Sequence, residues 1–105
     1  MHSVSLAAVG AALLLATMPA LATEPALALA QKNNCLSCHA VDHKLVGPSY
    51  REVAKKYAGQ AGASQLLQAK IKAGGGGTWG PVPMPPNPQV SDLELRQIVA
   101  WLLKQ

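Results

Sequence analysis

The sequence predicts an all-α fold built from four short helices and one long loop. Apolar residues recur three and four positions apart in several stretches, which is the spacing of one face of a helix. Two Ser-x-x-Glu boxes, at 49–52 and 91–94, mark helix starts. No run alternates apolar and polar residues for long enough to be a convincing strand. With 105 residues, half of them apolar, the chain has material for one domain.

The first segment has the layout of a secretory signal peptide. An uncharged apolar run extends from Val4 to Met18, and small residues follow it at Ala20 and Ala22. A retained membrane anchor is the alternative, but the run is shorter than the ~20 residues that a helical span needs. We therefore expect cleavage after Ala22, which leaves residues 23–105 as the mature domain.

The first two helices of the mature domain are expected at 25–33 and from the Ser49 cap to the glycine at 59. Pro25 suits the first position of a helix. On this helix Leu27, Ala30 and Asn34 share a face. Gly59 ends the second helix. The apolar face of the second helix consists of Tyr50, Val53, Ala54 and Tyr57.

The last two helices are expected at 63–73 and from 92 onward. Leu67 and Ile71 lie on one face of the third helix with Leu66 and Lys70 beside them, and four glycines at 74–77 end it. Residues 78–90 hold five of the eight prolines, so they form a stiff, extended loop. The apolar face of the fourth helix consists of Leu95, Ile98, Val99 and Leu102, with Leu93 and Trp101 widening it.

The charge pattern gives little support to nucleic-acid binding. The chain has a formal net charge of +4, but its lysines are scattered along the sequence. A nucleic-acid surface favours a basic stripe with aromatic residues beside it. We interpret the lysines as a solvated surface that can steer an acidic partner protein.

The sequence NNCLSCHAVD at 33–42 contains the chain's two cysteines, Cys35 and Cys38, followed directly by His39. Cys-x-x-Cys-His is the attachment signature of c-type haem, in which two thiols bond to the porphyrin and the imidazole binds the iron. A thiol-exchange site would need a βαβ setting, and zinc would need further ligands. A disulfide between these cysteines closes too short a loop to stabilise the fold much. The motif therefore indicates one covalently bound haem c.

His39 and Met84 are the expected axial ligands of the iron. After removal of residues 1–22, the remaining candidates for the second ligand are His43 and Met84. His43 is too close to His39 in the chain to reach the other face of the ring, and we interpret it as a surface residue. A lone methionine more often fills a core, but Met84 lies in the stiff segment P-V-P-M-P-P. A His/Met pair raises the reduction potential of the iron.

Three further residues are candidates for haem contacts. The carbonyl of Pro48 is placed to accept a hydrogen bond from the second imidazole nitrogen of His39, which would fix the ring. The indole N–H of Trp79 is within reach of a haem propionate, with core packing as the alternative. Lys70 is a candidate partner for a propionate, with simple solvation as the alternative.

Five segments together are more specific than the cysteine motif alone: CLSCHA, KLVGPSY, AKKYAGQAGA, WGPVPMPPN and VSD…WLLK. Over essentially the whole mature chain, the sequence resembles the small bacterial class I cytochromes c, in particular the cytochrome c-551 (cytochrome c8) group. The resemblance implies four to five short helices wrapped around one covalently bound haem, with the first and last helices crossing. It also implies the roles given above to the cysteines, to both axial ligands, to Pro48 and to Trp79.

Three positions depart from that family's pattern. Asn34 stands where relatives often have glycine, and Ala30 stands where they often have an aromatic residue. We therefore expect a helix crossing in which Trp101 and Leu102 supply more of the bulk. Lys70 replaces a common arginine, so a propionate contact there would be a single-point charge pair.

The expected function is one-electron transfer without enzymatic activity, because an iron with two protein ligands has no open site for a substrate. We expect a periplasmic monomer without stable membrane insertion. Its partners would be periplasmic or membrane-bound redox proteins, such as a nitrite reductase or an oxidase, docked transiently by charge. One alternative is a small haem enzyme or gas sensor in which Met84 leaves the iron. Another is a subunit or tethered domain of a larger complex.

Overall fold

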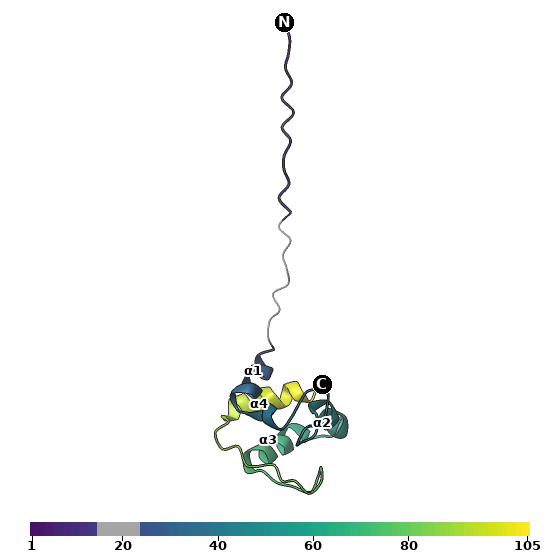
Figure 1. Ribbon diagram of the computed structural model, residues 1–105, viewed down its shortest axis with the longest axis vertical. Helices are drawn as coiled ribbons and strands as arrows, with labels where there is room; N and C mark the ends of the chain where they lie inside the picture. The colour runs from purple at the N-terminus through teal and green to yellow at the C-terminus, as the bar shows by residue number, and fades with distance from the viewer. Residues whose placement is uncertain (15–23) are drawn as a thin grey trace.

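The structure is a computed structural model that describes residues 1–14 and 24–105. Residues 1–14 form an extended, exposed segment without a helix (Figure 1). The expected cleavage site after Ala22 lies outside the described residues. Among the helices of the described ranges, none combines the length and the apolar character that crossing a membrane requires.

Within residues 1–14 and 24–105, the structure has four α-helices and one short 3-10 turn, arranged as Figure 1 shows. The prediction of an all-α fold is confirmed. In residues 1–14 and 24–105 the extended pairings are two isolated bridges, His39 with Lys44 and Gly75 with Met84. The elements in chain order are α1 (Pro25–Lys32), η1 (Cys35–Ser37), α2 (Tyr50–Tyr57), α3 (Ala63–Ala73) and α4 (Asp92–Leu102).

Serine caps start α2 and α4, as the two Ser-x-x-Glu boxes predict. The Ser49 hydroxyl accepts a hydrogen bond from the Glu52 backbone N–H at 3.0 Å. The Ser91 hydroxyl accepts the equivalent bond from Glu94 at 3.1 Å. Each bond satisfies a backbone donor that the first turn of a helix leaves without a partner. The two caps therefore fix where these helices begin.

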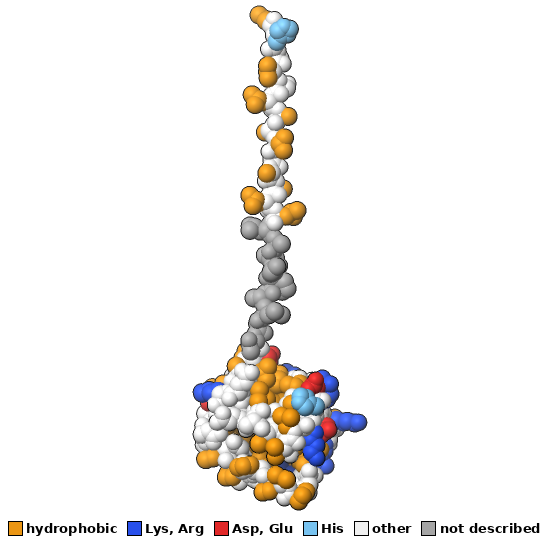
Figure 2. Space-filling model, in the orientation of Figure 1, with side chains coloured by type: hydrophobic (Ala, Val, Ile, Leu, Met, Phe, Trp, Pro, Cys, Tyr) orange, Lys and Arg blue, Asp and Glu red, His pale blue; other side chains and the backbone are white. Residues whose placement is uncertain are grey.

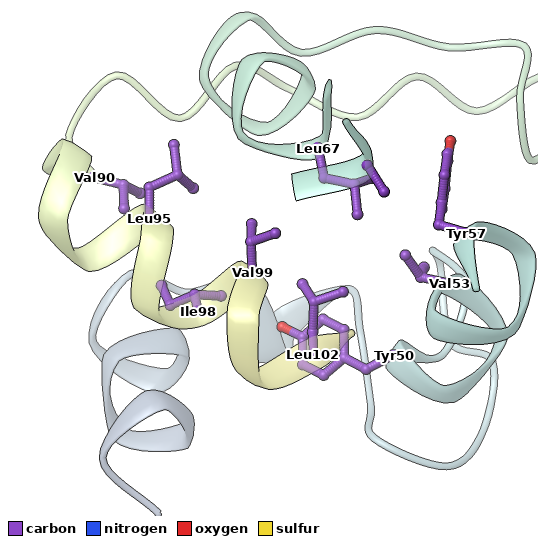
Figure 3. Close-up of a cluster of buried hydrophobic side chains, with 10 residues drawn as sticks. Tyr50, Val53, Tyr57, Leu67, Val90, Leu95, Ile98, Val99 and Leu102 are labelled. Carbon is purple, nitrogen blue, oxygen red and sulfur yellow. The ribbon is translucent and has the colours of Figure 1, made fainter. Parts of the chain in front are cut away.

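The core is packed around α4, which lies against α1, α2 and α3. Figure 3 shows side chains of α2, α3 and α4 pointing toward one another from three directions. The predicted face of α4 is confirmed, because all four of its residues are buried. Leu93 was wrongly placed on that face: it is 59 % exposed, because it lies in the first turn on the opposite side of the helix. The buried cluster consists of Tyr50, Val53, Tyr57, Ala63, Leu67, Val90, Leu95, Ile98, Val99 and Leu102.

The end of α1 differs from the sequence prediction. The helix stops at Lys32, and Asn34 has a left-handed backbone with φ of 60°. Asn34 is therefore outside the helix, and the face toward the core consists of Ala26, Ala30 and Asn33. The Asn33 side-chain amide donates to the Leu29 carbonyl at 2.9 Å, which completes this end of the helix.

The crossing of α1 and α4 is close. Ala30 of α1 and Val99 of α4 have no exposed surface. Alanine is small, so its position on α1 lets the backbones of the two helices approach each other. Trp101 is half-buried beside Pro25 and Ala26 of α1 and meets the Tyr50 ring edge-on, with centroids 5.4 Å apart. Trp101 thus lies near the start of α1, while Leu102 is buried in the cluster with α2 and α3; that these two residues supply more of the bulk at the crossing stays a prediction.

Candidate functional site

One cavity of about 280 Å³ lies among the helices and is bounded on one side by the loop after α3. Most of the side chains around it are apolar, including Val53, Leu67, Ile71, Leu95 and Ile98. All seven residues predicted as site residues line this cavity: Cys35, Cys38, His39, Pro48, Lys70, Trp79 and Met84. The structure thus brings together residues that are up to 49 positions apart in the sequence, Cys35 and Met84 being the most distant.

The turn at η1 presents both thiols and the imidazole to the cavity. The backbone N–H groups of Cys38 and His39 both donate to the Cys35 carbonyl, at 3.3 and 3.0 Å. The left-handed residue Asn34 starts this turn directly after α1, where an L-residue is strained and glycine is more easily accommodated. No disulfide joins Cys35 to Cys38. Burial raises the pKa of the Cys35 thiol, with a hydrogen bond to Tyr50 opposing the effect.

The His39 ring is held on two sides. Its Nδ1 lies 2.6 Å from the Pro48 carbonyl oxygen. A carbonyl can only accept, so Nδ1 carries the proton and Nε2 keeps its lone pair free. The Tyr50 ring stacks on the imidazole, with centroids 5.5 Å apart and planes 21° apart.

Gly47 allows the approach of the chain to this ring. A Cβ at Gly47 would lie 2.6 Å from Cε1 of His39, so any larger residue would displace the imidazole. Sequence reasoning identified Pro48 but missed the roles of Gly47 and Tyr50. The adjacent glycine and proline were the signal available for Gly47, because glycine is used where backbone and side chain approach closely.

Met84 is held by a two-bond backbone ladder. Its N–H donates to the Gly75 carbonyl at 2.7 Å, and the Gly75 N–H donates to the Met84 carbonyl at 3.0 Å. Gly74 passes so close that a Cβ there would lie 2.7 Å from the Met84 carbonyl oxygen. On the C-terminal side of Met84, Asn87 holds the loop to α3, since its backbone and side-chain N–H groups both donate to the Ile71 carbonyl. Segment 74–87 is therefore tied to the end of α3, as its prolines suggest.

Trp79 and Lys70 lie at the rim of the cavity. Trp79 is 41 % exposed, and the Lys56 ammonium lies 5.6 Å from its ring centroid. The Lys70 ammonium donates to the Thr78 hydroxyl at 3.0 Å. Lys56 was missed, because nothing in the sequence places the end of α2 beside residue 79.

His43 lies outside the cavity, as expected of a surface residue. Its side chain is 65 % exposed and pairs with Asp42 at 2.7 Å. This bond lowers the pKa of the Asp42 carboxyl. In the part of the chain that the structure describes, no three His, Cys, Asp or Glu side chains are grouped as metal ligands, so the zinc alternative has no ligand set there.

Comparison with known proteins decides the family. The sequence pattern of the family described as cytochrome c matches residues 8–105. The chain belongs to the cytochrome c family. Cytochrome c-551 of Azotobacter vinelandii is 57 % identical to it over 75 residues, which are 71 % of this chain and 90 % of that protein. Cytochrome c-551 of Pseudomonas aeruginosa is 52 % identical over 77 residues, 73 % of each chain.

A solved structure supports the same assignment. Wild-type cytochrome c552 of Nitrosomonas europaea has a TM-score of 0.73 and 46 % identity, covering 74 % of this chain and 96 % of that one. As a cytochrome c of this group, the protein carries one covalently bound c-type haem with iron and serves as an electron carrier.

The residues present fit that cofactor. Two thiols lie on one turn, with an imidazole whose Nε2 has a free lone pair directly after them. Apolar walls suit the body of a porphyrin, and a thioether sulfur lines the same cavity from another segment.

Proposed function

We propose that this cytochrome c is a periplasmic one-electron carrier whose iron is bound by His39 and Met84, with thioether bonds at Cys35 and Cys38. The bound haem supplies one iron that gains or loses a single electron. The observation that carries the proposal is the joint presence of the thiols, a pre-oriented imidazole and a fastened methionine around one cavity.

The chain's own groups account for a carrier with a raised potential. The Pro48 carbonyl keeps the His39 proton on Nδ1 and makes the ring a better ligand. The Met84 thioether is a soft ligand that favours reduced iron. Because the ladder to Gly75 holds the backbone of Met84 in place, the ligand stays where it is when the charge on the iron changes.

The rim of the cavity suits brief contacts with partner proteins. Figure 2 shows apolar side chains over the lower end of the helical body, where the loop after α3 lies in Figure 1. Exposed apolar residues at this rim are Val46, Trp79 and Val82, and Lys44 lies among them. A small apolar contact favours weak, transient binding, and the formal net charge of +4 favours fast association with an acidic partner. We propose that the partners are redox proteins of the periplasm or the membrane, such as a nitrite reductase or an oxidase, and that the carrier is a soluble monomer.

Export is part of the proposal. The apolar run at 4–18 and the small residues before position 23 support cleavage after Ala22. The mass of the protein recovered from the periplasm should equal residues 23–105 plus one haem. Protein that retains residues 1–22 and stays with the membrane fraction would favour the tethered-domain alternative.

Replacement of the methionine tests the ligand assignment. We expect Met84→Ala to lower the midpoint potential by on the order of a few tenths of a volt, within the ~0.8 V range that axial ligands span. The sulfur-to-iron absorption band should vanish and the reduced protein should bind CO, because the sixth position is open. Val82→Ala changes an exposed residue in the same loop and should leave all three properties unchanged.

Two results would count against the proposal. An unchanged potential in Met84→Ala would show that another group binds the iron. Ready CO binding by the unmodified protein at neutral pH would instead support the alternative of a haem enzyme or gas sensor, in which Met84 leaves the iron.

A further inference from the structure

The segment that carries Trp79 receives little support from its own backbone. Between residues 76 and 83, the backbone hydrogen bond that the structure gives is the one from the Gly77 N–H to the Gly80 carbonyl, at 3.2 Å. Trp79 is 41 % exposed at the rim of the haem cavity. The position of its indole therefore depends on side-chain contacts from neighbouring elements.

Lys56 makes one of these contacts from the last turn of α2. Its ammonium lies 5.6 Å from the centroid of the Trp79 ring, inside the ~6 Å range of a cation–π attraction. The same ammonium lies 6.0 Å from the ring of Tyr57, which is buried and lines the cavity. Lys56 thus joins the end of α2 to the rim at residue 79.

Lys70 makes a second contact from α3. Its ammonium donates to the hydroxyl of Thr78 at 3.0 Å. Two lysines on different helices therefore hold two consecutive residues of a segment with little backbone support. They act on different parts of it: Lys70 holds the chain beside the indole, and Lys56 holds the indole itself.

We propose that Lys56 is a positioning residue for electron transfer, which holds the Trp79 indole at the cavity rim and thereby raises the reduction potential. This rests on the proposed haem carrier, and within it on the contact between the Trp79 indole N–H and a haem propionate that the sequence predicts. When the ring is free to turn into solvent, water reaches that edge of the haem and the indole N–H leaves the propionate. Both changes favour the more positively charged oxidised iron, since exposure and lost hydrogen bonds lower the potential.

The test compares two neighbouring lysines of α2. Lys56→Met and Lys55→Met remove the same charge and keep an unbranched stem. Lys55 is exposed, and the structure gives its side chain no hydrogen bond, ion pair or cation–π contact within residues 24–105. An exposed cation–π contact changes an equilibrium by about two- to fivefold, so the indole should leave the rim measurably more often in Lys56→Met.

We expect Lys56→Met to lower the midpoint potential more than Lys55→Met does, and to shift the NMR signal of the Trp79 indole N–H. Lys56→Arg should keep the midpoint potential and the position of the indole N–H signal, because a guanidinium also binds an aromatic face. Equal potentials in the two methionine variants, with the indole signal unmoved, would overturn the role of Lys56.

A further variant, Trp79→Leu, tests the contact between Trp79 and the propionate separately from the role of Lys56. In that background Lys56→Met and Lys55→Met should have equal effects, because no ring remains to be held. If Trp79→Leu alone leaves the potential unchanged, the propionate contact is wrong and the role of Lys56 fails with it. If Trp79→Leu lowers the potential while the two lysine variants of the unmodified protein match, only the role of Lys56 is wrong.

Discussion

At the scale of single residues, the closest packing is around the imidazole. His39 is fixed by the Pro48 carbonyl on one side and the Tyr50 ring on another. The backbone at Gly47 also lies close to the ring, since an added Cβ would lie 2.6 Å from its Cε1 atom. A side chain held on several sides keeps one orientation, which small changes in its surroundings then disturb.

The tight site at Gly47 gives a prediction for Gly47→Ala. We expect about 1–3 kcal/mol of lost stability in denaturant unfolding of the haem-bound protein, which is usual for an extra methyl group in a packed site. The NMR signals of the His39 ring should shift, because the ring must move. Gly76→Ala is the control, since its added Cβ meets Pro83 at 3.3 Å and does not touch His39. Unshifted His39 signals in Gly47→Ala would contradict the packing described here.

The residues found by sequence reasoning and those it missed differ in kind. Cys35, Cys38 and His39 are adjacent in the chain and carry their chemistry in their spacing, so they could be predicted. Gly47 and Lys56 act through contacts between separate elements, such as the approach of the end of α2 to Trp79. Such contacts depend on how turns and helices are oriented, which a linear pattern does not specify.

At the scale of elements, a polar cluster ties the end of α1 to the start of α4. The Lys32 ammonium lies 3.2 Å from the Glu94 carboxylate, and the Asn33 amide lies 3.5 Å from the same oxygen. Glu94 is also in the first turn of α4, where the helix dipole favours a negative charge. The hydrogen bond from Lys32 lowers the pKa of the Glu94 carboxyl.

This cluster predicts a pH dependence of stability. A carboxyl with a lowered folded pKa stabilises the fold above its unfolded pKa, about 4.3, and the contribution is lost as pH falls through the folded value. Glu94→Gln should therefore lower the unfolding free energy at pH 7 and have less effect at pH 3. Glu52→Gln is the matched control, because Glu52 follows the Ser49 cap in the same way and the structure gives its carboxylate no lysine partner within residues 24–105. If Glu94→Gln and Glu52→Gln lower the unfolding free energy at pH 7 equally, the ion pair between Lys32 and Glu94 has no specific stabilising role.

Helix positions were predictable to within a few residues, but which residues at the helix ends are buried was predicted less well. The serine caps gave the starts of α2 and α4 directly. The prediction for α1 extended the helical period to Asn34, although the chain leaves the helix at Asn33 to form the attachment turn. Periodicity has no information about where a helix gives way to a turn. Leu93 is a different case, because its position two residues before Leu95 already places it on the side of α4 opposite to the buried face.

At the scale of the whole molecule, the helices enclose a space instead of a continuous core. Most side chains of the buried cluster, which Figure 3 shows, line the cavity of about 280 Å³. At about 24 cal/mol per Å³, an empty cavity of this size costs about 7 kcal/mol. That is comparable with the entire 5–15 kcal/mol that stabilises an ordinary domain. We therefore expect the haem to supply much of the stability of the fold.

Removal of the attachment thiols tests this dependence. We expect the double variant Cys35→Ala, Cys38→Ala to carry no covalent haem. It should also lose most of its helical circular dichroism, because the free-energy cost of an empty cavity is comparable with the stability of the whole domain. Ser37→Ala lies in the same turn between the thiols and should keep both the haem and the helical signal. Helix content near that of the haem-bound protein in a colourless double variant would show that the chain closes over its own cavity. Covalent pigment surviving in that variant would show instead that the thiols are not the attachment points, since the chain has no other cysteine with which to form a thioether.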